Sequence, residues 1–257
     1  MTETDPGPAP GAAAAHLPRR EGVFVLGAMT LIVLLCWAYL LAGAGMDMSA
    51  RAQWSASYAG LMFLMWWIMM VAMMLPSAAP MILMFAKMSR RPEHGVLPPL
   101  PVMLFTLAYA VAWAAFSAVA VGFQWGLEAS GLISPMLKST SGVLSGSILV
   151  AAGLYQLTPL KHMCLRHCRS PLQFVLGHWR NGPGGAFRMG LSHGAYCVGC
   201  CWFLMALLFV GGVMNLLWIA GLTLLVLVEK IIPAGRWFGH ALGVGLTGWG
   251  IWMLAGI

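Results

Sequence analysis

Charge is scarce in this sequence. Only 8% of the 257 residues are Asp, Glu, Lys or Arg, whereas 60% are apolar. A water-soluble domain typically carries roughly 25% charged residues and is at most about half apolar. Because so few charges cannot cover a water-exposed surface, the composition excludes an ordinary soluble globular fold. The solvent that fits this composition is a lipid bilayer.

Signatures of common enzymes are also missing. The sequence has no Walker loop, no H-E-x-x-H, no G-x-S-x-G and no C-x-x-C-H haem attachment motif. The glycine-rich stretch 182–185 follows no strand pattern, so we interpret it as a loop breaker and not as a phosphate-binding loop. No face interleaves basic with aromatic residues, so a nucleic-acid partner is not expected. The sequence therefore assigns no catalytic residue and favours a protein that is not an enzyme.

Apolar stretches, by contrast, occupy most of the chain after residue 22. A transmembrane helix needs roughly 17 to 25 predominantly apolar residues. We therefore predict an all-α fold, a polytopic transmembrane helical bundle. Its expected spans, about seven, are 23–42, 58–85, 101–124, 142–160, 194–213, 215–232 and 237–256. The second stretch is too long for one straight span, and Pro76 and Pro80 predict a kink or a break within it.

The start of the chain differs from the rest. Residues 1–18 contain prolines, glycines and an alanine run without apolar periodicity, which predicts a disordered cytoplasmic tail. Arg19 and Arg20 then precede the first apolar stretch, as in a signal peptide. That stretch of about 20 residues exceeds the roughly 7–15 residues of a signal-peptide core, so we expect a retained first helix. Residues 19–257 are expected to form a single transmembrane domain.

The basic residues are distributed unequally between the two sides of this predicted bundle. With the N-terminus in the cytoplasm, twelve of the 14 Lys and Arg residues fall in cytoplasmic segments, and only Arg51 and Lys138 fall outside. Cytoplasmic segments of membrane proteins carry an excess of Lys and Arg. The distribution therefore predicts a cytoplasmic N-terminus and an external C-terminus. It also explains the net charge of +7.

Five of the six cysteines form two groups, while Cys36 stands alone in the first span as a small packing residue. Their spacing, i and i+4 in one group and i, i+3 and i+4 in the other, places each group on one helix face. Both groups are predicted at the cytoplasmic face, where thiols stay reduced, so disulfides are not expected. The second group would begin a helix at residue 194, where the helix dipole favours thiolate. The groups are Cys164 and Cys168, then Cys197, Cys200 and Cys201.

Such a set of thiols indicates a soft metal ion at this face. Thiolate ligands select Cu(I), zinc or an iron–sulfur cluster. Four ligands would suit zinc or iron–sulfur, and two or three would suit Cu(I), which we favour. His162, His167, His178 and His193 lie on the same side and could complete the ligand set. The alternative is that the cysteines are packing residues and the histidines interfacial ones.

Methionines are unusually frequent, with 20 in the chain. Met62, Met65, Met69 and Met73 follow helical spacing along the second span, and residues 46–48 of the predicted outer loop read Met-Asp-Met. Thioether sulfur is a soft ligand that suits Cu(I), so this stripe could conduct copper inward, with Met69 and Met73 as candidate ligands. The alternative is that methionine simply fills the core.

Four motifs resemble a known family. They are 73–80 (MMLPSAAP), 155–171 from YQLTPLK to CRSP, 194–202 (GAYCVGCCW), and Glu229-Lys230 followed by Pro233. They resemble the bacterial family of predicted metal-binding integral membrane proteins known as domain of unknown function 2182. The resemblance covers the chain from about residue 23 to its end. It implies a multi-pass protein of the bacterial inner membrane, and it assigns no activity.

Three hypotheses remain open at this point. The first is a membrane protein that binds copper at the cysteines for metal handling or transfer. Its partners would be the lipid bilayer and a metallochaperone or other membrane subunits. The second is a membrane thiol/disulfide or electron-transfer protein, in which neighbouring cysteines cycle between dithiol and disulfide. The third is an accessory subunit of a membrane complex, in which the 12 tryptophans anchor interfaces.

Overall fold

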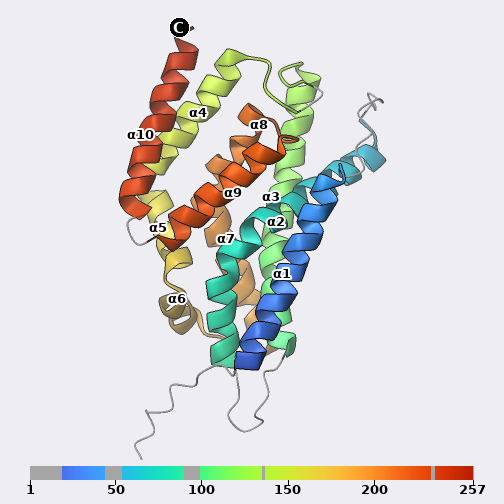
Figure 1. Cartoon of the computed structure of the whole chain (residues 1–257), viewed down its shortest axis with the longest axis vertical. Helices are drawn as coiled ribbons and strands as arrows, with labels where there is room; N and C mark the ends of the chain where they lie inside the picture. The colour runs from blue at the N-terminus through green and yellow to red at the C-terminus, as the bar shows by residue number, and fades with distance from the viewer. Residues whose placement is uncertain (1–18, 44–53, 90–98, 135–136, 233–234, 257) are drawn as a thin grey trace, which may run out of the picture.

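The computed structural model describes residues 19–43, 54–89, 99–134, 137–232 and 235–256. The described residues form ten helices and no β-strand, which confirms the all-α prediction (Figure 1). The predicted disordered tail, 1–18, lies outside them. The helices are α1 (Arg19–Leu41), α2 (Ala56–Ser89), α3 (Pro99–Ala129), α4 (Gly142–Gln156), α5 (Pro159–Arg169), α6 (Pro171–His178), α7 (Gly182–Ala206), α8 (Leu208–Gly211), α9 (Leu216–Ile231) and α10 (Gly235–Leu254).

Four helical segments are long and apolar enough to cross a membrane, namely 22–41, 56–89, 99–129 and 182–211. The pair formed by α4 and α5, bent by 66° at the break between them, would make a fifth. The last two expected spans correspond to α9, which has only 16 residues, and to the glycine-rich α10. The structure thus has four or five potential spans by length and composition, where the sequence led us to expect about seven.

Local signals in the sequence explain where α4, α5 and α9 begin. Ser141 caps α4 by accepting a hydrogen bond from the Leu144 amide, and Asn215 caps α9 in the same way. Thr158 caps α5, with Pro159 at the first helical position, as its sequence predicts. Proline also lacks the amide hydrogen that would continue α4, so the chain turns there.

One prediction about an individual helix was wrong. The helix that carries the second cysteine group begins at Gly182 and not at 194, so these cysteines lie well inside it. Its first half contains several glycines and Arg188, which weaken the apolar pattern, although Pro183 is a typical helix-start residue. In α2 the chain stays helical through Pro76 and Pro80, without a break. Figure 1 shows that α2 bends part-way along its length, which agrees with the predicted kink.

Small residues let two helix pairs approach closely. A Cβ at Gly190 of α7 would meet the Phe105 carbonyl of α3, and one at Gly194 would lie 2.5 Å from Ala112 Cβ. On the other side of the bundle, α4 and α10 contact each other through glycines. Between these pairs lie α2 and α9, and α1 packs along α2 (Figure 1). The buried core therefore sits where α2, α3, α7 and α9 meet.

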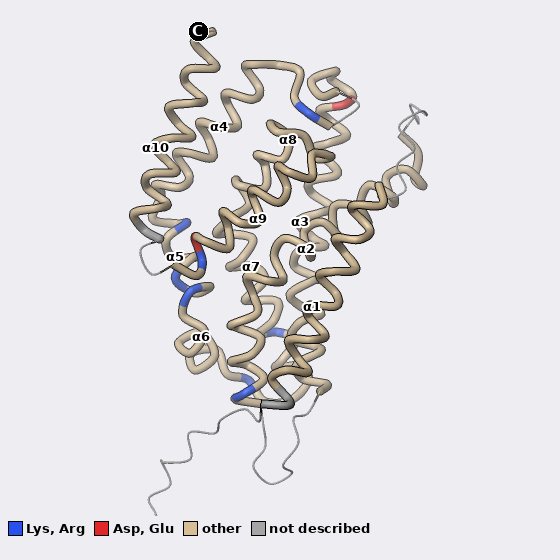
Figure 2. The backbone as a smooth tube through the Cα atoms, in the orientation of Figure 1, with Lys and Arg blue, Asp and Glu red and all other residues tan. Residues whose placement is uncertain are grey.

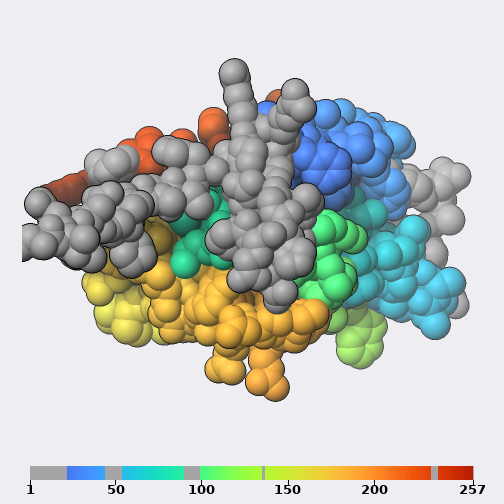
Figure 3. Space-filling view, turned by 90° about the horizontal axis from the view of Figure 1, so that it is seen from below, coloured from blue at the N-terminus to red at the C-terminus, as the bar shows by residue number. Residues whose placement is uncertain are grey.

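Charged residues are unevenly placed in the molecule. Figure 2 shows basic positions gathered in its lower half, around α5, α6 and the lower ends of the long helices. Figure 3 views that lower end, where the yellow and orange residues of α5 and α6 form part of the surface. Lys138 instead follows the opposite end of α3. The two ends of the molecule therefore differ in charge.

Candidate metal centre

The described cysteines of α5 and α7 meet inside the bundle. Cys168 of α5 lies with its Sγ 3.9 Å from the Sγ of Cys200 on α7, and both residues are buried. Cys164, half-buried one turn earlier, faces Gly199, where a Cβ would lie 2.9 Å from its sulfur. The glycine thus allows α5 to pack closely against α7. Tyr155 of α4 also donates a hydrogen bond to the Gly199 carbonyl, which ties a third helix to this point.

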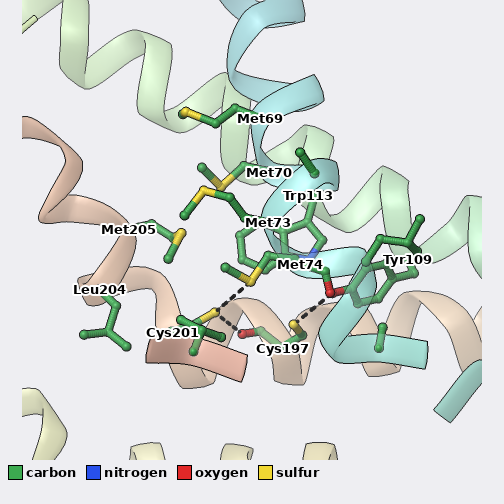
Figure 4. Packing of buried hydrophobic residues seen from close by; sticks show 14 of the residues in the cluster. Met69, Met70, Met73, Met74, Tyr109, Trp113, Cys197, Cys201, Leu204 and Met205 are labelled. Carbon is green, nitrogen blue, oxygen red and sulfur yellow. Dashed lines mark hydrogen bonds between the residues drawn. The ribbon is translucent and has the colours of Figure 1, made fainter. Parts of the chain in front are cut away.

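Cys197 lies deeper, against α3 and α9. Its Sγ is 3.1 Å from the hydroxyl of Tyr109 and 2.9 Å from Nζ of Lys230 (Figure 4 shows the tyrosine contact). Lys230 Nζ also donates to Ser77 Oγ at 3.0 Å. The ammonium of Lys230 thus lies against the sulfur of Cys197, where α7, α9 and α2 meet.

Cys201 faces the methionines of α2. Its Sγ lies 3.9 Å from Sδ of Met74. The Cys201 thiol also donates a hydrogen bond of 2.9 Å to the Cys197 carbonyl (Figure 4). The Cys200 thiol donates a hydrogen bond of 3.1 Å to the same carbonyl. The thiols of α7 therefore point in different directions around one turn, Cys200 toward α5 and Cys201 toward α2.

A layer of buried methionines continues from Cys201. Figure 4 shows Met69, Met70, Met73 and Met74 of α2 in sequence along the helix, with Met205 of α7 beside them. Each of the five is at most 1% exposed. The stripe predicted on this helix thus faces the interior of the bundle. The predicted outer-loop methionines, Met46 and Met48, lie outside the described residues.

The four histidines named from the sequence have different surroundings. His193 is buried and stacks against Tyr109, and its Nδ1 has no hydrogen-bond partner in the described part of the chain. His162 stacks on His240, and His167 stacks on Tyr196. His178 stacks on Phe174 of α6. Of the four, His193 contacts Tyr109, whose hydroxyl contacts the Cys197 sulfur.

The sulfur pairs fit a soft ion in size and in chemistry. An ion bound by two sulfurs at roughly 2.3 Å separates them by about 3.8 Å in tetrahedral and about 4.6 Å in linear geometry. Both observed separations, Cys168–Cys200 and Cys201–Met74, are 3.9 Å. Within the described ranges, no three His, Cys, Asp or Glu side chains are already arranged around one metal position. The donors therefore come as two-sulfur pairs, one of them thiol with thioether.

Comparison with protein families adds an independent finding. Residues 63–253 match the model of a family described as PpoB2: Copper chaperone. The chain belongs to the PpoB2 copper chaperone family. No curated protein and no solved structure matched the chain.

Family membership supports the copper-related function expected from the sequence, although not the name domain of unknown function 2182. The region matched to the PpoB2 family begins at the methionines of α2 and includes both cysteine groups. Copper, as the cargo of this family, is a soft ion when reduced, and the buried sulfur donors suit it. Copper is thus the metal that both the family and the donor chemistry favour.

Several residues around the buried cysteines were not identified from the sequence. Tyr109 lies in an ordinary apolar stretch, and no motif in the sequence singles out Met205. Lys230, noted in the sequence only as part of the Glu229-Lys230 motif, reaches Cys197 from α9. Lys161 pairs with Glu229 at 2.6 Å, and both side chains are almost completely buried. The sequence did contain a signal for the pair of Lys161 and Glu229, because opposite charges near the ends of two spans often pair.

Proposed function

We propose that this chain is a membrane-embedded copper chaperone that binds Cu(I) between the sulfurs of α5, α7 and α2. The observation that carries the proposal is the buried Cys168–Cys200 sulfur pair, 3.9 Å apart, with the methionine layer next to it. The ligands would come from Cys164, Cys168, Cys197, Cys200 and Cys201. Met74 is added to the ligands predicted from the sequence because its sulfur lies 3.9 Å from Cys201.

Copper is favoured over zinc and iron–sulfur by the thioethers. Zinc and iron–sulfur sites in proteins use thiolate, imidazole or carboxylate ligands, whereas thioether sulfur selects Cu(I). Met69, Met70 and Met73 are all buried next to the thiol cluster. Cu(I) moves between sulfur ligands by exchanging one for another, so neighbouring weak and strong sulfur donors suit a protein that accepts and releases the ion.

We further propose a direction for this transfer. Copper would enter along the methionines of α2, including Met69 and Met73, and reach the cysteines. His162, His167 and His193 lie toward the α5 and α6 end and would assist its release. A metallochaperone or another membrane subunit would receive it there. The weaker thioether ligands would precede the stronger thiolates, so binding becomes tighter along the route.

Copper transfer in this direction requires that the protein have one defined orientation in the membrane. We propose seven spans in a single transmembrane domain, 19–257, with the N-terminus in the cytoplasm of a bacterial inner membrane and the C-terminus outside. Support comes from the basic residues gathered at the α5 and α6 end, because cytoplasmic segments carry most Lys and Arg (Figure 2). Support also comes from Figure 1, where α1 begins at one end of the molecule and α10 finishes at the other.

Copper binding by the purified full-length protein tests the proposal. The protein, reduced and in detergent, is loaded with Cu(I) and analysed for metal content beside the double variant Cys168→Ser/Cys200→Ser. Cys36→Ser is the matched control, since Cys36 lies on α1 away from both groups. We expect stoichiometric copper in the wild type and the control, and loss of it in the double variant. Full copper retention by the double variant would overturn the proposal.

The same thiol pair keeps one alternative function open. Two thiols 3.9 Å apart can also form a disulfide, as a thiol/disulfide or electron-transfer protein would require. Alkylation of thiols in intact cells separates the two functions. A mixture of reduced and oxidised Cys168 and Cys200 would favour the redox function, whereas fully reduced thiols together with bound copper favour the chaperone.

A further inference from the structure

A lysine ammonium lies within the thiol cluster. Lys230 of α9 is 8% exposed, and its Nζ lies 2.9 Å from Cys197 Sγ and 3.0 Å from Ser77 Oγ. A positive charge beside a site for a positive ion repels that ion. The arrangement is therefore not what a site that only needs strong metal binding would contain.

Among the described residues, no carboxylate contacts this ammonium. Glu229 precedes Lys230 in α9, but its carboxylate is paired with Lys161 at 2.6 Å. The groups that contact Lys230 Nζ are a thiol and a hydroxyl, Cys197 and Ser77. The positive charge of Lys230 thus lies against the sulfur of Cys197, in the same turn of α7 as Cys200 and Cys201, and adds to the charge balance of whatever those thiols bind.

The charge of a metal–thiolate complex depends on the ion. Cu(I) with two thiolates carries one negative charge, which the ammonium of Lys230 would neutralise. Zn(II) with two thiolates is already neutral, so the ammonium would leave one excess positive charge. Uncompensated charge is costly in a protein interior because the low dielectric gives it little solvation. A monovalent ion is therefore favoured by this arrangement, and a divalent ion is disfavoured.

We propose that Lys230 is a specificity-determining residue that selects monovalent soft ions over divalent ones by completing a neutral complex with two thiolates. The inference rests on the proposed copper site and concerns its selectivity. It assigns a function to a lysine that would otherwise weaken the binding of any cation.

Competition between Ag(I) and Zn(II) tests this role. Ag(I) is the probe because it is soft and monovalent like Cu(I) and does not change oxidation state. The reduced full chain in detergent is dialysed against both ions, and the bound ratio is measured by elemental analysis. In Lys230→Gln we expect the preference for Ag(I) over Zn(II) to fall by roughly tenfold or more. Lys230→Arg should restore the preference, and Lys138→Gln, a remote exposed lysine, should not change it.

A second variant decides the question if Lys230→Gln does not fold. Ser77→Asp keeps the lysine but places a carboxylate beside its ammonium, so it should shift the ratio toward Zn(II) in the same way. An unchanged ratio in folded Lys230→Gln, or in Ser77→Asp, overturns the inference. Failure of the wild type to bind either Ag(I) or Cu(I) would instead overturn the proposed copper function, so the two failures are distinguishable.

Discussion

Cys164 and Cys168 are one helical turn apart on α5 but have different neighbours. Cys168 is buried and faces the sulfur of Cys200, whereas Cys164 is half-buried and faces the backbone at Gly199. Sequence spacing alone makes the two equivalent as ligands. Their surroundings place Cys168 in the buried sulfur pair with Cys200 and Cys164 at the edge of the thiol cluster.

Single substitutions should therefore separate the two cysteines. We expect Cys168→Ser to weaken Cu(I) affinity at least about tenfold, a loss of roughly 1.4 kcal/mol or more, and Cys164→Ser to weaken it less. Competition with a Cu(I) chelator of known affinity measures both. Equal losses in the two variants would show that α5 contributes both sulfurs to the ion.

The ion pair between Lys161 and Glu229 is buried, so we expect the stability of the protein to depend on both partners. Removing one partner leaves the other charge buried without compensation, which typically costs about 3–5 kcal/mol. We expect Glu229→Gln to lower the free energy of unfolding by about that amount, measured by denaturant titration in detergent. Replacing both residues by apolar ones, Lys161→Met with Glu229→Leu, should recover most of the loss. If Glu229→Gln unfolds like the wild type, the pair does not stabilise the fold.

At the scale of elements, α4 and α10 are held at short distance by glycine. A Cβ at Gly153 of α4 would lie 2.6 Å from the backbone nitrogen of Thr247, and one at Gly250 of α10 would lie 2.7 Å from the Gly146 carbonyl. Apolar side chains gain little from meeting each other in lipid, so close backbone contact is a main source of helix association there. These glycines thus determine how α10 docks.

Adding one methyl group to this contact should separate the helices. We expect Gly153→Ala to destabilise the protein by about 1–3 kcal/mol through overpacking. Gly248→Ala is the matched control, because nothing lies within 4 Å of its Cβ position. It should be neutral or stabilising, since alanine favours helix more than glycine. Thermal unfolding of both variants in detergent measures the difference, and a similar midpoint for the two would contradict the packing argument.

In the whole molecule, most Lys and Arg residues lie at the end formed by α5, α6 and the lower ends of the long helices, and few lie at the other end (Figure 2). Arg180 lies between α6 and α7 at the basic end, and Lys138 lies between α3 and α4 at the other. Four or five segments have the length and apolarity of spans, and α9 and α10 are the remaining two expected ones. The orientation proposed above places Arg180 in the cytoplasm and Lys138 outside.

Labelling with a membrane-impermeant thiol reagent tests this orientation. In intact spheroplasts, Lys138→Cys should react directly, whereas Arg180→Cys should react only after the membrane is permeabilised. The wild type measures the background from its own cysteines. Labelling of both positions from the same side would contradict the proposed number of spans, and the reverse pattern would contradict the orientation.

Composition and local pattern were sufficient for much of the fold. The scarcity of charge and the long apolar stretches predicted an all-helical protein, and Thr158-Pro159 predicted the start of α5. These signals are local, because a helix cap or an apolar run is legible within a few neighbouring residues. The start of α7 was missed because its glycines and Arg188 interrupt the apolar pattern, although the chain there is helical.

The sequence by itself determined which candidate donors this protein carries, soft sulfur on α2, α5 and α7, because residue type determines the chemistry of a donor. Only the tertiary structure decided which sulfurs meet. Cys168 contacts Cys200 and Cys201 contacts Met74 because close helix packing brings α5 and α2 to opposite sides of α7. The same packing brings Lys230 from α9 to Cys197. Contacts between distant segments depend on how the helices pack, which no local pattern in the sequence encodes.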